Sequence, residues 1–433
     1  MVTFENIFLN KKILVYGLGK SGVSTFKFLK NKSNVFLYDD FSLNIKNSQI
    51  LKKFVSFKNI LNSQFDAIIL SPGIDIDNCK LSKFLKKNKK KIYTDLDIFY
   101  SFYKNDCITI TGTNGKSTAC QILYEVLLKH KRDVKLVGNI GNPILSVKKV
   151  KPNTIFVIEA SSYQLEYSKI FKSKYGVILN ITPDHIERHK TINQYVKAKF
   201  KLLKNQSKKS FGFVKKNDPI IKKELKNKNF KSKIIQVNPI KINKVINKLD
   251  NKYFFTDANK ENLSFVLSVS EKLKLKKNLI FKTISKFKGL KYRQQIIHKE
   301  KNLTIINDSK STSFSSSIGV LKSNTNIYWL LGGMHKKGDR FKMPKKFHKR
   351  IKAFIFGKER NFFNKQLKGK IKCKNFNRLR DALKFVLLKI KDEKFLDKTI
   401  LFSPSAASFD SFKNFEDRGL YFNKLIEKYL NDK

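Results

Sequence analysis

The chain is poor in cysteine and in acidic residues, and it has no long apolar run. Its 433 residues include four cysteines, which lie far apart and form no CxxC pair, so no disulfide framework is predicted. No apolar run approaches the roughly 18 residues that a membrane helix needs. The first residues also lack the charged and apolar regions of a secretory signal. These absences predict a soluble chain in a reducing cytoplasm, without membrane insertion.

The scarcity of acids leaves a large positive charge. The chain has 34 acidic residues against 91 basic ones, which gives a formal net charge of +57. Such an excess normally indicates a nucleic-acid or anionic-membrane partner. Here the lysines are spread through every segment, and few of the cations are arginine, the residue favoured for bidentate phosphate and base contacts. We therefore favour a solvated lysine-rich surface that attracts anionic substrates over a nucleic-acid partner.

Short apolar runs alternate with helical patterns along the whole chain, and its length suggests about three domains. Apolar strands of this length between helices predict parallel sheets that are covered on both faces. The predicted strands are residues 13–16, 35–38, 67–70, 108–111, 154–158, 176–180, 304–306, 327–331, 353–356 and 399–402.

Residues 110–118 read Ile-Thr-Gly-Thr-Asn-Gly-Lys-Ser-Thr and stand between a predicted strand and a predicted helix. A glycine loop in that place turns backbone N–H groups and a helix N-terminus toward a phosphate chain. In such loops the lysine reaches the outer phosphates and the hydroxyl after it binds Mg²⁺. The loop predicts a nucleotide site, although Ile110 stands where the general pattern has its first glycine. The residues expected to form it are Gly112, Thr113, Asn114, Gly115, Lys116, Ser117 and Thr118.

A second glycine pattern lies near the start of the chain. Residues 13–22 are an apolar run that leads into Gly-x-Gly-x-x-Gly, and the next predicted strand ends at Asp39. That offset is close to the one expected for an acid that binds ribose. The pattern reports a diphosphate at a helix N-terminus but not which nucleotide, so alone it would suggest NAD. Gly73, in a turn after the third strand, would lie at the same sheet edge.

Two polar clusters follow strands of the central segment. Glu159 follows the predicted strand 154–158, beside the phosphate loop, where it could bind Mg²⁺. His185 closes Asn-Ile-Thr-Pro-Asp-His after the next strand and is a candidate ligand, whereas His189 is expected to be structural. Lys199 lies in a helical stretch with many lysines, and its surroundings alone indicate a surface lysine.

Together these motifs resemble the Mur ligases of peptidoglycan synthesis. The resemblance rests on Gly-Thr-Asn-Gly-Lys-Ser-Thr at 112–118, Glu-Ala-Ser-Ser-Tyr-Gln at 159–164 and Asn-Ile-Thr-Pro-Asp-His at 180–185. Three later stretches resemble the D-glutamate-adding branch: Asn-Asp-Ser-Lys-Ser-Thr at 307–312, Ser-Pro-Ser-Ala-Ala-Ser-Phe-Asp at 403–410 and Phe-Lys-Asn-Phe-Glu-Asp-Arg-Gly at 412–419. The motifs stand in family order over nearly the whole chain. The Asp-Asn-Pro-Arg signature of the diaminopimelate-adding relatives is absent from the sequence.

The resemblance implies an α/β fold of three domains. These are a Rossmann-like N-terminal domain that binds UDP (1–98), a central phosphate-loop ATPase domain (99–289) and a Rossmann-like C-terminal domain that binds the amino acid (290–433). It also implies ATP-dependent joining of D-glutamate to UDP-N-acetylmuramoyl-L-alanine through an acyl phosphate. Two Mg²⁺ ions would take part, and the chain would act as a monomer.

The resemblance further implies roles for single residues. The catalytic residues would be Lys116, Glu159, His185, Lys199 and Lys336. The metal ligands would be Ser117, Glu159, His185 and a CO₂-derived carbamate on Lys199. ATP would also be held by Asn262, Arg293 and Asp308. The UDP-sugar would be held by Gly17, Leu18, Gly19, Lys20, Asp39, Gly73, Asn139, Ser162 and Gln164. The incoming D-glutamate would be held by Lys310, Thr312, Ser405 and Phe412.

Some positions depart from the family pattern. Glu261 and Phe265 flank Asn262 where the family has His and Asn, so the family's adenine contacts do not transfer directly to this segment. Tyr292 replaces the usual His before Arg293, and Met334 stands where an acid is common.

Three alternatives stay open on the sequence alone. Folylpolyglutamate synthase shares the central domain, but it lacks a domain corresponding to the Gly-x-Gly-x-x-Gly block. A nucleic-acid-binding NTPase would need a basic stripe rather than dispersed lysines. A UDP-sugar-binding protein without catalysis would have no need of Lys116, Glu159, His185 and Lys199 together.

Overall fold

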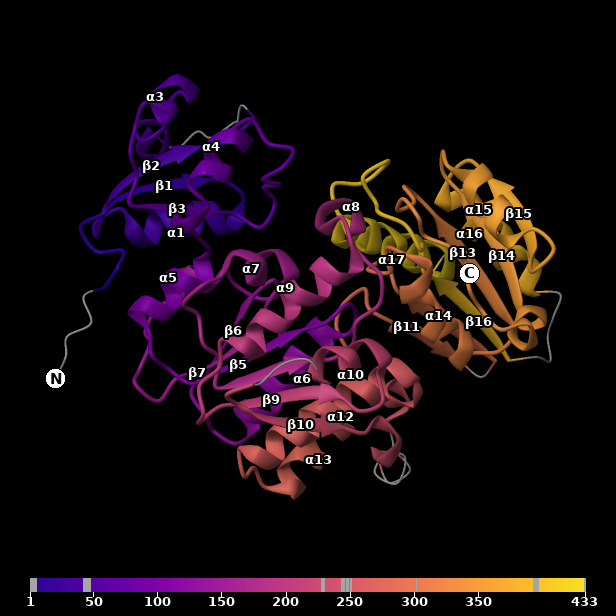
Figure 1. Ribbon diagram of the computed structural model, residues 1–433. Helices are drawn as coiled ribbons and strands as arrows, with labels where there is room; N and C mark the ends of the chain where they lie inside the picture. Colours follow the sequence, from indigo (N-terminus) through magenta and orange to yellow (C-terminus); the bar gives the residue numbers. More distant parts are fainter. Residues whose placement is uncertain are drawn as a thin grey trace. The chain divides into compact units, whose positions relative to one another are not determined.

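The computed structural model describes residues 6–41, 48–226, 230–242, 246, 249, 251–300, 302–391 and 397–431. It contains three sheets, each built mainly from parallel strands and flanked by helices (Figure 1), which confirms the predicted α/β class. Every predicted strand is present, with ends that differ by at most two residues. The strands Ile92–Tyr93, Val134–Gly138, Phe211–Lys215, Lys233–Val237, Gln295–Glu300 and Lys372–Phe376 were not predicted.

The residues divide into two compact units. The first comprises Met1–Leu249 and Glu261–Ser285, and the second comprises Asp250–Lys260 and Lys286–Lys433. The first unit holds two of the three sheets, and the second holds the third. The predicted boundaries at 98 and 289 stay a prediction. Helix α5 (Asp95–Phe102) runs across residue 98.

The first sheet has the order β2-β1-β3-β4, with all neighbours parallel. Its strands are β1 (Lys12–Tyr16), β2 (Asn34–Tyr38), β3 (Ala67–Leu70) and β4 (Ile92–Tyr93). The accompanying helices are α1 (Lys20–Leu29), α2 (Ser48–Leu51), α3 (Phe57–Leu61), α4 (Ser82–Lys87) and the short η1 (Lys89–Lys91). β1 reads Lys-Ile-Leu-Val-Tyr, a run of β-branched, aliphatic and aromatic residues that suits a strand buried on both faces.

The second sheet has the order β10-β9-β8-β5-β7-β6 and is parallel throughout. Its strands are β5 (Cys107–Thr111), β6 (Val134–Gly138), β7 (Ile155–Glu159), β8 (Tyr175–Ile178), β9 (Phe211–Lys215) and β10 (Lys233–Val237). The helices are α6 (Lys116–Lys129), α7 (Ser162–Tyr167), α8 (Ile186–His189), α9 (Ile192–Lys204), α10 (Pro219–Lys226), α12 (Asp257–Lys272) and α13 (Lys277–Ser285), with the short η2 (Ile144–Ser146), η3 (Pro239–Ile242) and η4 (Lys252–Phe255).

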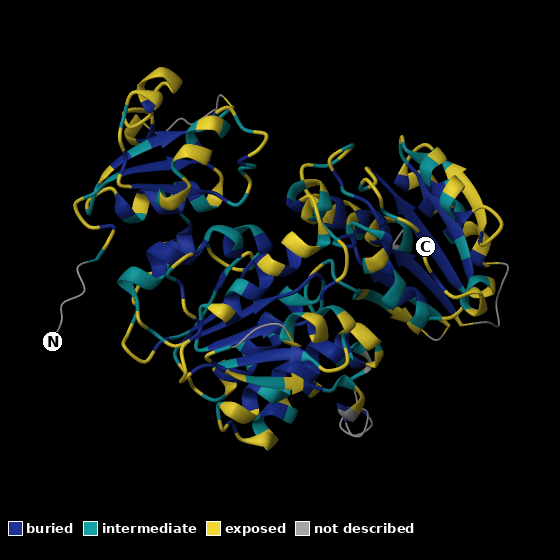
Figure 2. Ribbon diagram, viewed as in Figure 1, coloured by how far each residue is buried: buried dark blue, intermediate teal, exposed yellow. Residues whose placement is uncertain are grey.

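Helices cover both faces of this sheet. α7 and α9 pack on one face, while α6 and α13 lie together on the other (Figure 1). α6 buries Ala119, Ile122, Leu123, Val126 and Leu127, the spacing of one helical face. Figure 2 shows the central strands of the sheet dark blue, whereas the edge strand β10 and the outward helix faces carry exposed residues in yellow.

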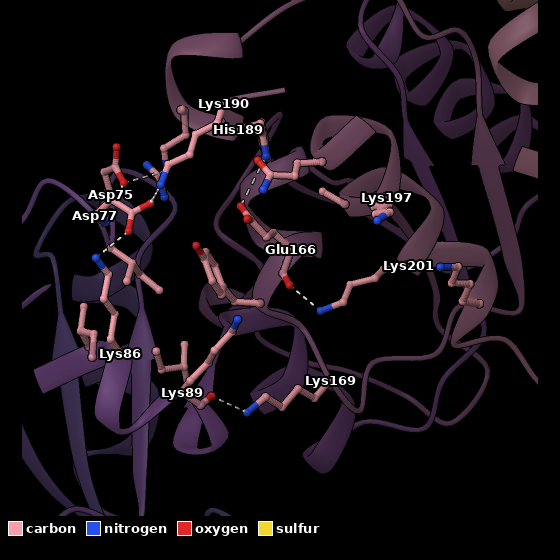
Figure 3. Close-up of a pocket in the computed structure, with 18 residues that line it drawn as sticks. Asp75, Asp77, Lys86, Lys89, Glu166, Lys169, His189, Lys190, Lys197 and Lys201 are labelled. Carbon is pink, nitrogen blue, oxygen red and sulfur yellow. Dashed lines mark hydrogen bonds and ion pairs between the residues drawn. The ribbon is translucent and has the colours of Figure 1, made fainter. Parts of the chain in front are cut away.

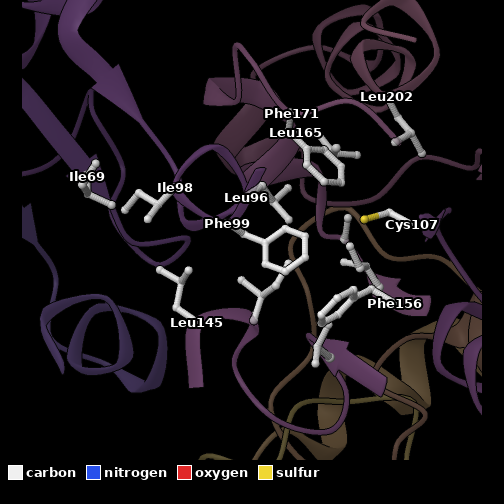
Figure 4. Close-up of a cluster of buried hydrophobic side chains, with 14 of the residues drawn as sticks. Ile69, Leu96, Ile98, Phe99, Cys107, Leu145, Phe156, Leu165, Phe171 and Leu202 are labelled. Atoms are coloured by element: carbon white, nitrogen blue, oxygen red, sulfur yellow. The ribbon is translucent and has the colours of Figure 1, made fainter. Parts of the chain in front are cut away.

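One apolar cluster joins the first two sheets. It runs from Ile69 of β3 through Leu96 and Phe99 of α5 to Phe156 of β7 and Leu202 of α9 (Figure 4). The rings of Phe99 and Phe156 meet edge to face, with centroids 4.8 Å apart. Because no polar layer separates the two sheets at this point, they form one compact unit.

The third sheet has the order β11-β12-β16-β13-β14-β15. Its strands are β11 (Gln295–Glu300), β12 (Leu303–Asn307), β13 (Ile327–Gly332), β14 (Ile351–Phe356), β15 (Lys372–Phe376) and β16 (Lys398–Phe402). Helices α14 (Phe314–Ser323) and α15 (Arg360–Leu367) cover one face, and α16 (Leu379–Lys391) and α17 (Phe415–Asn431) cover the other, with the short η5 (Lys345–Arg350) beside β14. β11 pairs antiparallel with β12, so the expectation of purely parallel sheets is wrong at this edge.

Candidate functional site

The phosphate loop connects β5 to α6, as the sequence predicts. Gly115 caps the helix with a φ of 82°, a left-handed conformation that favours glycine. A β-carbon there would lie 2.1 Å from Oδ1 of Asn262, so glycine also allows the loop to approach α12. Lys116 folds back along the loop, and its Nζ donates to the carbonyl oxygens of Gly112 and Thr113, each at 2.9 Å.

Side chains that follow β8 hold the loop in place. The Asn114 N–H donates to Oδ1 of Asn180 at 2.9 Å, and Asn180 Nδ2 returns a bond to the Asn114 carbonyl at 3.2 Å. The Thr113 hydroxyl accepts from the Thr182 N–H at 3.0 Å and lies 3.1 Å from the Tyr195 hydroxyl. The loop geometry therefore depends on a neighbouring strand as well as on its own glycines.

Ser117 and Glu159 form a pair of oxygen groups beside the loop. Parallel pairing sets Ile110 of β5 opposite Glu159 of β7, so the carboxylate lies next to the strand that enters the loop. The Ser117 hydroxyl donates to Oε2 of Glu159 at 2.6 Å, and Glu159 is only 4% exposed. Hydroxyl and carboxylate oxygens are the ligands that Mg²⁺ prefers. Among the described residues there is no cluster of three or more His, Cys, Asp or Glu side chains able to hold a metal.

Lys199 is buried rather than exposed, and the interpretation of a surface lysine is wrong. It is 2% exposed in α9, its Nζ donates to the Gly112 carbonyl at 2.9 Å, and it lies 4.4 Å from the centre of the Tyr195 ring. Burial, with the nearby Lys116 ammonium, holds the pKa of Lys199 well below its usual 10.5. The sequence pattern did not distinguish it from its neighbours, of which Lys197 is exposed and Lys201 is half-buried.

A cavity of about 320 Å³ collects several of the predicted residues. Its lining includes Gly73, Lys116, Asn139, Ser162, His185 and Lys199. His185 has a φ of 54°, unusual for a residue with a side chain, and its ring lies 5.2 Å from that of Tyr163. Residues far apart in the sequence thus meet at the carboxyl edge of the second sheet. We call this space the loop cavity.

Two residues that sequence reasoning did not assign to the site support it. His189 is 2% exposed, and its Nε2 lies 2.9 Å from the Ser162 hydroxyl, which agrees with the structural role expected of it. Asp95 of α5 accepts bonds from Gln164 Nε2 at 3.0 Å and from the Ser21 hydroxyl at 2.7 Å. No sequence pattern marks Asp95, because its partners come from α1 and α7.

The first sheet presents its own nucleotide edge. Asp39 Oδ2 accepts from the Leu18 N–H at 2.6 Å, which ties the end of β2 to the glycine turn. A β-carbon at Gly22 would lie 1.8 Å from the Gly17 carbonyl oxygen, so only glycine lets α1 begin this close to the turn. Gly19 is the N-terminal cap of α1, and the exposed Lys20 is its first residue.

In the second unit, two of the predicted cations lie near one ring. Lys310 Nζ lies 4.0 Å and the Arg293 guanidinium 5.9 Å from the centre of the Phe415 ring. Asp308 is buried, where its carboxylate accepts from the Gln294 N–H at 3.1 Å and the Ser403 hydroxyl at 2.8 Å. Burial raises the pKa of Asp308 to about 7.

The remaining predicted residues of that unit differ in how far they are buried. Ser405 is fully buried with a φ of 55°, and its hydroxyl lies 2.6 Å from that of Ser317. Thr312, Lys336 and Phe412 are partly exposed, and the Phe412 ring lies 5.4 Å from that of Tyr421.

Comparison with known proteins identifies the family. The chain matches the Mur ligase middle domain over residues 110–280 and the Mur ligase MurD-like N-terminal domain over residues 11–92. A protein of Rickettsia felis named "UDP-N-acetylmuramoylalanine--D-glutamate ligase" is 32% identical over 449 residues, which cover 99% of each chain. The chain belongs to the Mur ligase family. A Francisella tularensis protein of the same name is 34% identical over 422 residues, covering 96% of this Mur ligase and 95% of the relative.

Solved Mur ligases share the fold. A MurF ligase from Thermotoga maritima in complex with ADP matches with a TM-score of 0.58 at 14% identity, over 99% of this chain and 98% of that chain. A UDP-N-acetylmuramate-alanine ligase, MurC, from the same organism gives 0.56 at 16% identity, over 98% and 100%. These likenesses confirm the three-domain α/β fold. The MurD-like N-terminal match also separates this Mur ligase from folylpolyglutamate synthase.

The departures from the Mur ligase pattern have definite places. Phe265 is 1% exposed, so its side chain is part of the core and does not face a nucleotide. Glu261 accepts from Asn180 Nδ2 at 2.6 Å and pairs with Lys215, which connects α12 to the residue that holds the phosphate loop. Tyr292 packs its ring against Gly419, where a β-carbon would come within 2.4 Å of it.

None of the helices that the structure describes has the length and apolar content to cross a lipid bilayer.

Proposed function

We propose that this Mur ligase joins D-glutamate to UDP-N-acetylmuramoyl-L-alanine, with ATP as the source of energy. Mur ligases are ATP-dependent enzymes that form amide bonds, so the reaction class follows from the family. The substrates follow from the names of relatives that match nearly the full chain. The observation that carries the proposal is the hydrogen-bonded Ser117–Glu159 pair. Ser117 adjoins Lys116 in the sequence, and that lysine lines a cavity with His185 and Lys199.

The chemistry divides into two steps. The alanyl carboxylate attacks the γ-phosphorus of ATP, which gives an acyl phosphate and ADP. The amine of D-glutamate then attacks the acyl carbon, phosphate leaves with the bonding pair, and the amine loses a proton. Lys116 and the loop N–H groups would hold the outer phosphates of ATP. Asn262, Arg293 and Asp308 would help to seat ATP, Asp308 through the groups it holds because its own carboxylate is buried.

The oxygen groups beside the loop fit Mg²⁺. Mg²⁺ commonly takes one or two protein oxygens and fills its remaining positions with substrate phosphates and water, and Ser117 with Glu159 supplies such a pair. When bound, the ion neutralises charge between the triphosphate and the attacking carboxylate. His185 and a modified Lys199, which both line the loop cavity, would hold a second ion.

Lys199 is suited to carry a carbamate. Burial lowers the pKa of Lys199 well below 10.5 and so favours its neutral amine, which is the form that can attack CO₂. The new N–C bond forms as one C=O bond of CO₂ opens, and the amine loses a proton. The product is an anion that removes the repulsion between Lys199 and Lys116 and offers oxygen ligands to a metal.

The substrate groups divide among the sheets. The UDP end would lie at the glycine turn and Asp39 of the first sheet, and the sugar would extend past Gly73 toward Asn139, Ser162 and Gln164. Lys310, Thr312, Lys336, Ser405 and Phe412 would receive D-glutamate, for which ammonium and hydroxyl groups are suitable partners. The proposal includes a monomeric enzyme that acts in the cytoplasm. Sedimentation of the purified chain would test whether it is a monomer.

Phosphate release from ATP tests the proposal. The assay contains UDP-N-acetylmuramoyl-L-alanine and either D-glutamate, L-glutamate, diaminopimelate or no amino acid. We expect release only with D-glutamate, and none from a Lys116→Ala variant. Equal release with another amino acid would keep the ligase class and change the substrate. Release that needs nucleic acid, or no release in any mixture, would refute the proposed reaction.

A further inference from the structure

A second cavity lies in the first unit, apart from the loop cavity. It measures about 550 Å³, and it shares no lining residue with the loop cavity. Its walls come from the segment after β3, α4 and η1 on one side and from α7, α8 and α9 on the other (Figure 3). This volume is typical of sites for small molecules. We call it the lysine cavity.

Direct contacts fix the two walls relative to each other. Asp77 pairs with Lys190 at 2.5 Å, and Arg188 Nη2 donates to the Ile74 carbonyl. Lys169 Nζ donates to the carbonyls of Lys89 at 3.0 Å and Lys90 at 2.5 Å. Polar bonds therefore connect the two walls at both ends of the cavity.

The acidic residues at the lysine cavity already have basic partners, and Oε2 of Glu166 lies 3.5 Å from Nδ1 of His189. Asp77 pairs with both Lys86 and Lys190, which lowers its pKa to about 2. Asp75 Oδ1 lies 3.7 Å from Nε of Arg188. Burial raises the pKa of Glu166, which disfavours its negative charge. None of these acids forms an ion pair with the ammonium groups of Lys89, Lys169, Lys197 or Lys201, although Glu166 attracts Lys201.

Four lysines supply those ammonium groups. The ammoniums of Lys89 and Lys197 form no hydrogen bond or ion pair with any residue that the structure describes, and the two side chains are exposed. Lys169 and Lys201 bond only to backbone carbonyls, Lys201 to those of Glu166 and Ser168. Lys89 and Lys201 repel each other, and burial lowers the pKa values of Lys169 and Lys201. An anion placed among them would relieve both effects.

We propose that the lysine cavity binds a small phosphate-bearing anion. Phosphate oxygens can accept from several ammonium groups at once, and a lysine acts on them as a point charge from a flexible stem. The phosphate group could come from inorganic phosphate, which the proposed ligase reaction releases, or from a phosphorylated metabolite. The site depends on its own residues and stands whether or not the ligase assignment holds.

Calorimetric titration with pyrophosphate at fixed ionic strength tests the proposal. The full-length chain carries Lys116→Ala, so that the phosphate loop does not take up the probe. We expect the Lys116→Ala chain to bind pyrophosphate. Adding Lys89→Ala and Lys197→Ala should weaken this binding about tenfold for each ammonium removed, the usual effect of losing a hydrogen bond to a charged group. Circular dichroism confirms that each variant is folded.

The matched control is a Lys208→Ala/Lys209→Ala pair, which removes the same charge from exposed positions outside the cavity. It should bind pyrophosphate as the Lys116→Ala parent does. Equal weakening in both pairs would mean general charge attraction and would overturn the proposal, as would the absence of binding in the Lys116→Ala chain. Titrations with phosphate and with ribose 5-phosphate, which lacks the uracil of the proposed UDP substrate, then distinguish the sources, since tighter binding of the sugar phosphate indicates a phosphorylated metabolite.

Discussion

At the scale of single residues, burial decides the chemistry of the ionisable groups. Lys199 and Asp308 have ordinary polar side chains, yet each lies in the interior with few charges to oppose the cost of ionisation. Burial favours the neutral amine of Lys199 and the neutral carboxylic acid of Asp308. Their roles therefore depend on packing that the neighbouring residues in the sequence do not reveal.

Replacement of Lys199 by alanine tests its role in catalysis. We expect kcat for phosphate release to fall on the order of 100-fold or more, the usual effect of removing a group that stabilises transition-state charge. Lys208→Ala, on an exposed turn, should keep the activity of the unmodified chain. Unchanged kcat in Lys199→Ala would exclude both a carbamate and any other essential role of this amine.

Asp308 makes the stability of the second unit depend on pH. Its pKa is about 7 in the folded chain and about 3.8 for the unperturbed group of the unfolded chain, so its stabilising contribution is complete below 3.8 and is lost as pH rises through about 7. We expect Asp308→Asn to gain stability relative to the parent chain between pH 5 and pH 8. Urea unfolding followed through Trp329, the single tryptophan, measures this because that ring is buried in β13 of the same sheet. A constant difference between the two pH values would contradict the assignment.

At the scale of elements, the phosphate loop is held by strands and helices other than its own. Asn180 follows β8, and Glu261 of α12 reaches Asn180 from the opposite side. The short apolar strands and the glycine loop could be predicted, because each is a local pattern. The contact between Glu261 and Asn180 could not, because it depends on how α12 packs beside the sheet.

Replacement of Glu261 by alanine tests this support. The change leaves Lys215 and Asn180 without their shared acceptor, so we expect KM for ATP to rise about tenfold, with a smaller change in kcat. Glu261→Gln keeps an acceptor for Asn180, so its KM for ATP should lie between those of the parent chain and Glu261→Ala. Glu271→Ala, at an exposed position of the same helix, is the control. If Glu261→Ala and Glu271→Ala give the same KM, Glu261 does not position the loop.

At the scale of the whole molecule, the apolar cluster around α5 makes one unit of two sheets. Leu96, Ile98 and Phe99 contribute to a core that also contains strand residues from both sheets. The predicted boundary at 98 falls within this helix, of which residues 95–99 are buried. Cooperative unfolding of the first unit follows from that shared core.

Phe99→Ala should lower the stability of the first unit by about 3–5 kcal/mol, the usual cost of removing a buried aromatic ring. Hydrogen exchange should show faster opening of both β1 and β7, with β13 of the second unit unchanged. Phe402→Ala should give the opposite result, because Phe402 stacks on Phe422 within the second unit at 4.3 Å. Loss of protection in β7 alone would show that the first two sheets unfold independently.

The sequence by itself determined the α/β class, the strands that carry motifs, the phosphate loop and the family, since all of these rest on local patterns. The tertiary structure decided which polar side chains are buried and which meet. In the sequence Lys199 cannot be told apart from the many lysines around it. The packing of α9 against the sheet buries it and brings its Nζ to the Gly112 carbonyl of the phosphate loop. Asp95 and Glu261 acquire their partners, and the lysines of the lysine cavity come together, in the same way, because side chains from distant segments meet only when the helices pack.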